Sequence, residues 1–108
     1  MNYEVIVLRR AELDLNRNAL WWAEHRDVDQ ALRWLDEFMA AIDTLVSNPE
    51  RHALVREDEL FPFPVRQLVF GVGSKPTHRA VFSVEGEKVL VYTIRHLAQD
   101  DLTADDIG

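Results

Sequence analysis

A chain of 108 residues is long enough for one domain and too short for two, so we expect a single domain over 1–108. It contains no cysteine, which excludes disulfides, thiolate zinc sites and cysteine nucleophiles and is typical of a reducing compartment, here the cytoplasm. The net charge of −7 argues against nucleic-acid binding over the whole surface, and neither a signal peptide nor an apolar run of about 20 residues is present, so no membrane association is expected.

The N-terminal half predicts a strand and two helices. Residues 3–8 are short, β-branched and aromatic, which is typical of a strand. Apolar residues then recur on one helical face from Ala11 to Ala23. Asp27 is placed to cap a second helix, whose apolar stripe runs from Val28 to Val46 and stops before Asn48-Pro49. The short join predicts an antiparallel helix hairpin.

The C-terminal half predicts three strands. A polar connection with prolines spans 48–64, and strands are expected over 65–70, 77–84 and 88–95, separated by short turns. Such turns favour an antiparallel meander. From 97 to 108 the chain is polar and acidic, and we expect this tail to be loosely packed.

Together these elements predict an α+β fold of order β-α-α-β-β-β. An antiparallel helix hairpin packs on one face of a small, mainly antiparallel four-stranded sheet, in which the position of the first strand is left open. Strand alternation assigns the following residues to the hairpin face: Leu68, Phe70, Ala80, Phe82, Val84, Leu90, Tyr92 and Ile94. The opposite face carries Arg79 and Arg95 and is expected to be exposed, as a binding surface.

This order of elements, with its particular residues, resembles the RelE/ParE toxin superfamily, and more closely its ParE branch. The resemblance covers nearly the whole chain, and it depends on the order and spacing of several short motifs. The matching segments are Ala11-Glu12-Leu13-Asp14-Leu15, Ala41-Ile42-Asp43-Thr44-Leu45 with Asn48-Pro49, Val65-Arg66-Gln67-Leu68 with Phe70-Gly71, His78-Arg79-Ala80-Val81-Phe82, and Val89 to His96 with Gln99-Asp100.

The resemblance implies the toxin of a type II toxin–antitoxin pair, and hence a cognate antitoxin as partner. ParE-like members act on DNA gyrase by binding it, whereas RelE-like members cut messenger RNA on the ribosome. A third possibility is an orphan member without toxicity. The acidic chain and the absence of lysine between 48 and 64 favour the ParE-like or the orphan hypothesis over the ribonuclease.

Few residues qualify as site candidates. For a ribonuclease, which needs an acid, a base and cations, the catalytic candidates are Arg66, Arg79 and His96. For partner binding the candidates are Arg66, Arg79, Arg95 and Trp21. As an alternative, Arg66 and Arg79 pair with the acidic run 57–59. The histidines lack metal-ligand spacing, so we expect no metal. We also expect no cofactor and no sequence-specific DNA binding by this chain alone.

Overall fold

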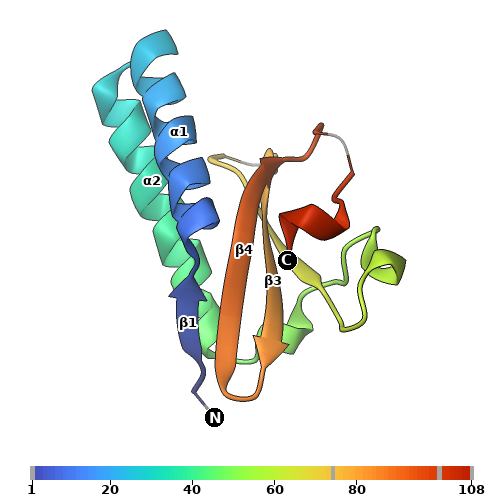
Figure 1. The fold of residues 1–108 in the computed structure, drawn as a ribbon. Helices are drawn as coiled ribbons and strands as arrows, with labels where there is room; N and C mark the ends of the chain where they lie inside the picture. Colours follow the sequence, from blue (N-terminus) through green and yellow to red (C-terminus); the bar gives the residue numbers. More distant parts are fainter. Residues whose placement is uncertain (1, 74, 100, 108) are drawn as a thin grey trace.

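The predicted order of elements is confirmed. The structure, a computed structural model, describes residues 2–73, 75–99 and 101–107. Its elements, shown in Figure 1, are β1 (Glu4–Val7), α1 (Arg9–His25), α2 (Val28–Asp43), β2 (Arg66–Phe70), β3 (His78–Glu85) and β4 (Lys88–His96). The protein is therefore an α+β fold, as the pattern of the sequence predicts.

The helix hairpin forms where the apolar periodicity places it. The Asp27 side chain accepts a hydrogen bond of 2.8 Å from the Gln30 N–H, so it caps α2 as expected. The α-helix ends at Asp43, earlier than the apolar stripe suggests, and continues as a 3₁₀ turn over Thr44–Val46. Asn48 then adopts the left-handed conformation (φ 47°), which redirects the chain. Among the described residues, neither helix is long and apolar enough to span a bilayer.

The sheet has the strand order β1-β4-β3-β2. The first strand pairs with β4 in parallel, and the other neighbours are antiparallel. The parallel pairing reaches only Val91 of β4. Beyond it α1 lies beside β4, and the Asp14 carboxylate accepts hydrogen bonds from the Ile94 N–H (3.0 Å) and the Thr93 hydroxyl (2.7 Å). A helix side chain thus replaces the missing strand.

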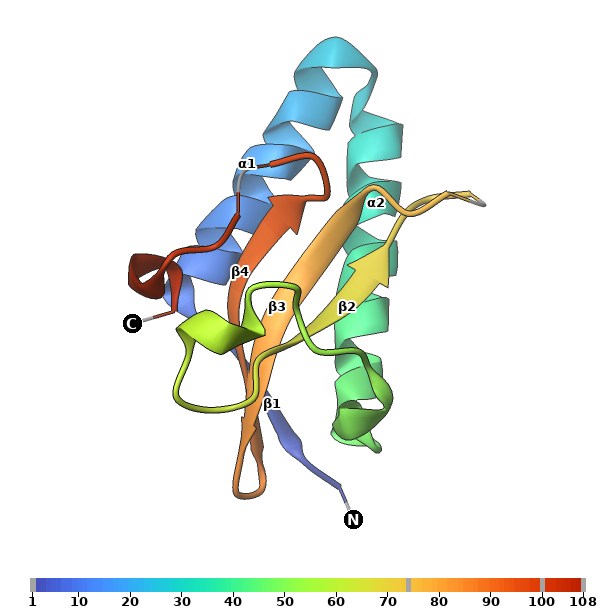
Figure 2. The ribbon, with the colours of Figure 1, turned by 90° about the vertical axis from the view of Figure 1, so that its right-hand side faces the viewer.

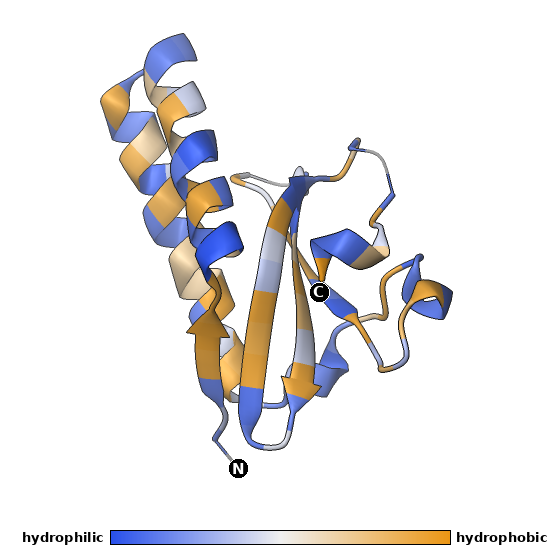
Figure 3. Cartoon of the chain, in the orientation of Figure 1, coloured by the Kyte–Doolittle hydropathy of each residue, from blue (hydrophilic) through white to orange (hydrophobic). Residues whose placement is uncertain are grey.

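Three layers follow from this arrangement. Figures 1 and 2 show the hairpin on one face of the sheet, and the 48–65 connection together with the C-terminal segment on the other. In Figure 3 hydrophobic residues dominate β1 and much of β4, beside hydrophobic bands on both helices. The main core between hairpin and sheet consists of Ala11, Leu15, Trp34, Phe38, Ile42, Leu45, Leu68, Ala80, Phe82, Val89, Val91 and Ile94.

Part of the predicted hairpin face of β4 is wrong. Val89 and Val91 are fully buried in the main core, in place of Leu90 and Tyr92. The cause is a bulge: Val81 pairs with Thr93 whereas its neighbour Phe82 pairs with Val91. Tyr92 is therefore an extra residue in β4, and it reverses the inside–outside alternation on either side of it.

The expectation of an exposed opposite face and a loosely packed tail is also wrong. A second core covers that face, formed by Val55, Val65, Val81 and Leu102 with Phe61 and Ile107 packed against it. Leu102 comes from the acidic tail and is almost fully buried. The tail then forms a 3₁₀ turn over Ala104–Asp106, closed by a capping box between Thr103 and Asp106.

Candidate functional site

A cavity of about 350 Å³ lies between α1 and the paired ends of β3 and β4. Two of the predicted site residues, Trp21 and His96, lie in its wall. The full lining is Asn18, Trp21, Trp22, Thr77, His78 and His96. We call it the two-histidine cavity, because His78 and His96 face each other across the β3–β4 pair with ring centroids 5.1 Å apart.

Hydrogen bonds define the orientation of His78. Its Nδ1 lies 2.7 Å from the Thr77 hydroxyl, and its Nε2 lies 3.2 Å from Oδ1 of Asn18. The Asn18 amide NH₂ donates to the backbone carbonyl of Asp14 (2.8 Å), which leaves Oδ1 to accept from His78. This network places a proton on Nε2 and fits a neutral imidazole whose Nδ1 accepts from the Thr77 hydroxyl.

The surroundings of His78 favour the same neutral form. The ring is buried against Trp34 at 5.3 Å and Phe38 at 6.4 Å between centroids. Burial, followed by the charge of His96, lowers the pKa of His78 to about 4. At neutral pH this wall of the cavity is therefore uncharged.

The outer wall of the cavity is aromatic and partly exposed. Trp21 stacks on His25 (centroids 4.5 Å, interplanar angle 13°) and meets Trp22 edge to face. Half of its surface is exposed. The exposed His96 is oriented by the Ala98 N–H, which donates to its Nδ1 at 3.0 Å. Such a surface can receive an apolar or aromatic side chain of another protein and offer it polar contacts.

The arginine candidates lie elsewhere. Arg79 is only 2% exposed, and its guanidinium makes two hydrogen bonds to Glu57 (3.0 and 2.7 Å) and one to Gln67 (3.0 Å). Its expected exposure is wrong, whereas its pairing with the acidic run is confirmed. Arg95 is also buried, and it forms an ion pair with Asp106 at 3.6 Å. Both arginines hold the second core together.

Arg66 does not join the other catalytic candidates. Its guanidinium donates to the carbonyl of His52 at 2.8 Å. It opposes Phe82, four residues along β3 from the His78–His96 pair, which is roughly 13 Å of strand. Arg79 points to the opposite side of the sheet, toward Glu57. The structure thus separates Arg66, Arg79 and His96, and the described residues contain no group of three or more His, Asp or Glu side chains that could hold a metal ion.

A second surface runs along the outside of the helix hairpin. Leu20, Val28 and Leu32 are 61%, 61% and 54% exposed. Val28 and Leu32 belong to the predicted apolar stripe of the second helix, so part of that stripe lies outside the core. They border an apolar groove of about 400 Å³ between the two helices, whose lining is Asn16, Ala19, Leu20, Ala23, Val28, Ala31, Leu32 and Leu35. The apolar stripe of α2 is wider than the core requires, and the excess forms this hairpin groove.

Comparison with known proteins identifies a family and similar solved structures. The family described as "ParE toxin of type II toxin-antitoxin system, parDE" matches residues 5–101. Among solved structures, a chain described as "Chromosomal ParDE TA system from P. aeruginosa" superposes with a TM-score of 0.71 at 19% identity, over 87% of this chain and 95% of that one. At that identity the superposition establishes the shared fold. No curated protein matches the sequence.

Proposed function

Since the chain belongs to the ParE toxin family of type II toxin–antitoxin systems, we propose that it inhibits growth by binding a target protein and that a cognate antitoxin neutralises it. The observation that carries this proposal is the pair of separate surfaces on the hairpin. Trp21 lies in the two-histidine cavity, whereas its neighbour Leu20 lies in the hairpin groove. One surface is available for the antitoxin while the other meets the target.

The hairpin groove suits the antitoxin. Contiguous exposed apolar surface of this kind marks protein interfaces, and a groove between two helices accepts the apolar face of a third helix. The second helix also carries Asp29, Asp36, Glu37 and Asp43 against one base, Arg33. Charge complementarity therefore favours a basic amphipathic segment of the antitoxin.

The two-histidine cavity suits the target, for which DNA gyrase is the candidate that the family resemblance implies. Trp21 supplies the large exposed aromatic ring that often dominates binding energy at interfaces. A direct contact of Arg66, Arg79 or Arg95 with a partner stays a prediction. For Arg79 and Arg95 it would require opening the buried ion pairs with Glu57 and Asp106.

Two adjacent substitutions separate the surfaces. We expect Leu20→Asp to weaken antitoxin binding at least about tenfold, as loss of an interface hot spot does, while the protein stays toxic and escapes rescue by the co-expressed antitoxin. Trp21→Ala should do the reverse, with toxicity lost and antitoxin binding retained. Growth curves and calorimetric titration of the complex measure both. Loss of both activities in either variant, with the fold intact, would contradict the assignment of separate surfaces.

The target is tested with purified protein in two parallel assays. Inhibition of supercoiling and accumulation of cleaved gyrase–DNA complexes, both abolished by Trp21→Ala, would support gyrase as the target. Primer extension on messenger RNA from induced cells tests the ribonuclease alternative. Site-specific cuts that disappear in His96→Ala, with gyrase unaffected, would show that the protein cleaves RNA. They would contradict the proposal that it acts by binding a target protein.

A further inference from the structure

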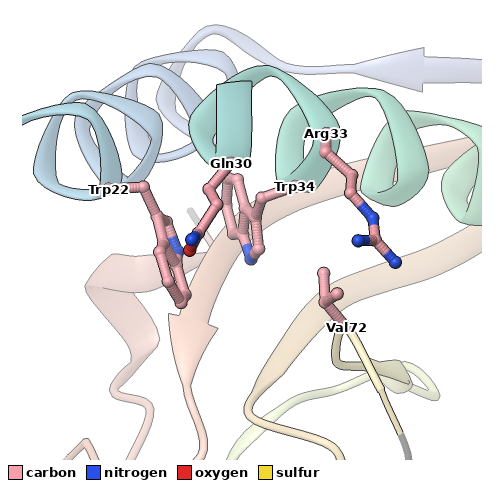
Figure 4. A pocket seen from close by; sticks show the side chains of 5 residues that line it. All are labelled: Trp22, Gln30, Arg33, Trp34 and Val72. Atoms are coloured by element: carbon pink, nitrogen blue, oxygen red, sulfur yellow. The ribbon is translucent and has the colours of Figure 1, made fainter. Parts of the chain in front are cut away.

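A second, smaller cavity of about 150 Å³ lies between the hairpin and the loop that follows β2. Its lining is Trp22, Gln30, Arg33, Trp34 and Val72, and we call it the indole pocket (Figure 4). Figure 4 shows the nitrogen edge of Trp34 directed away from α2, between Gln30 on one side and Arg33 and Val72 on the other.

Trp34 has an unsatisfied hydrogen-bond donor at this pocket. The residue is only 2% exposed, and its Nε1 finds no acceptor among the described residues. A buried N–H without a partner is costly, and such groups are rare in folded proteins. The donor is therefore unused within the described part of the fold, on a residue that lines the pocket.

Packing holds this donor in place. The Trp34 ring makes edge contacts with Phe38 and His78, each with centroids 5.3 Å apart. It belongs to the main core, so the ring cannot turn its N–H toward solvent without disrupting that core. A donor fixed in this way favours binding, because no side-chain freedom is lost when the acceptor arrives.

The other polar groups at the pocket define the acceptor. Arg33 contributes a guanidinium and Gln30 an amide, and the lining contains no acidic side chain. Arg33 does contact Glu37 at 3.3 Å, but that pair is exposed and spans one helical turn, so exchange for another carboxylate is inexpensive. An indole N–H and a guanidinium that line one pocket can each bind one oxygen of a carboxylate, which a single neutral carbonyl cannot offer.

We infer that the indole pocket binds a side-chain carboxylate, from a Glu or Asp of a protein partner, through the Trp34 N–H and the Arg33 guanidinium. The ring of Trp22 packs against the methylene groups that carry the carboxylate. This inference rests on the proposed function, because it names a chemical group on a protein that binds this chain. Its test uses the toxin chain alone, so it can fail independently of the Leu20 and Trp21 experiments.

The test follows the indole N–H signals of the ¹⁵N-labelled full chain by NMR. The probe is N-acetyl-L-glutamate N-methylamide, and the control is the matching glutamine compound, both added at constant ionic strength. We expect the Trp34 indole proton to shift downfield and saturate with the glutamate compound alone, with a Kd on the order of 1 mM for a ligand of this size. Trp34→Phe assigns the signal, and Trp21→Phe and Trp22→Phe assign it by elimination if that variant does not fold.

Arg33→Gln should weaken binding about tenfold, as expected for loss of one charge-assisted hydrogen bond. Arg9→Gln, an exposed arginine at the other end of the hairpin, should bind as the parent does. The inference would be overturned by any of three results: no shift at Trp34, equal shifts with both compounds, or an unchanged Kd in Arg33→Gln. The pocket would then bind no more than water. Binding of free glutarate without binding of the capped glutamate would also overturn the inference.

Discussion

Arg79 of β3 and Glu57 of the 48–65 connection form a buried, two-pronged ion pair, with nitrogen–oxygen distances of 3.0 and 2.7 Å. The side chains are 2% and 3% exposed. The second oxygen of Glu57 also accepts the Leu102 N–H at 2.7 Å, so one carboxylate joins the sheet, the connection and the C-terminal segment.

Removal of one member of this pair should destabilise the protein strongly. Arg79→Ala leaves the buried Glu57 carboxylate with only the exposed Arg56 guanidinium, 3.8 Å away, as a cation. We expect a loss of about 3–5 kcal/mol in the free energy of unfolding by urea. The control, Arg33→Ala, removes an exposed ion pair and should cost within about 1 kcal/mol. Equal losses in the two variants would show that the buried pair contributes no more than a surface pair.

Glu57 should also make stability depend on pH in the acid range. Hydrogen bonds from Arg79 lower its pKa from 4.5 to about 2, against the opposing effect of burial. The unfolded chain therefore takes up this proton first as the pH falls, so the contribution is complete above 4.5 and is lost between 4.5 and 2. It amounts to about 3 kcal/mol at about 1.4 kcal/mol per pKa unit. Urea titrations at a series of pH values should show that the free energy of unfolding depends less steeply on pH in Glu57→Gln than in the parent. The two proteins should differ in this way only between pH 4.5 and 2.

His78 should make stability depend on pH in a second range, which lies above that of Glu57. Burial lowers its pKa from 6.5 to about 4, so the folded protein holds the neutral ring while the unfolded chain becomes protonated. Stability from this group is complete above 6.5 and falls as the pH drops from 6.5 toward 4. An NMR titration should give a midpoint for His78 near 4, and His78→Gln should flatten the stability profile in this range. A midpoint near 6.5 would mean that the ring is open to water.

The C-terminal segment should behave as part of the core. Leu102 is 1% exposed within the second core, so Leu102→Ala should cost about 2–5 kcal/mol in the free energy of unfolding. Leu60 lies in the connection and is 58% exposed, so Leu60→Ala should change stability by less than about 0.5 kcal/mol. If both variants unfold at the parent's urea midpoint, the segment is not anchored in solution.

The parts of the fold that depend on local patterns were predictable from sequence. The Asp27 cap and the position of Leu68 and Ala80 on the hairpin face follow from short-range chemistry and alternation. The bulge at Tyr92 was not predictable, because residues 89–94 are all β-branched, aromatic or leucine, and such a stretch shows no pattern that marks one extra residue.

The burial of Arg79 could not be predicted from the sequence pattern either. Alternation assigns Arg79 to the face away from the hairpin, but whether that face is open depends on Val55 and Leu102, which lie in irregular segments without periodicity. The sequence did not predict the two-histidine cavity as a unit. His96 and Trp21 were singled out, whereas Asn18 and Thr77 acquire their role only through contact with His78.

Asp14 has a consequence for the solubility of the free toxin. A β-strand with unpaired N–H groups along its edge invites strands of other molecules to add to it, which is a common route to aggregation. The C-terminal part of β4 would present such an edge, because β1 ends at Val7 and pairs only as far as Val91. There, however, the Ile94 N–H donates to the Asp14 carboxylate. By this contact α1 protects the sheet from intermolecular pairing at times when no partner protein covers the molecule.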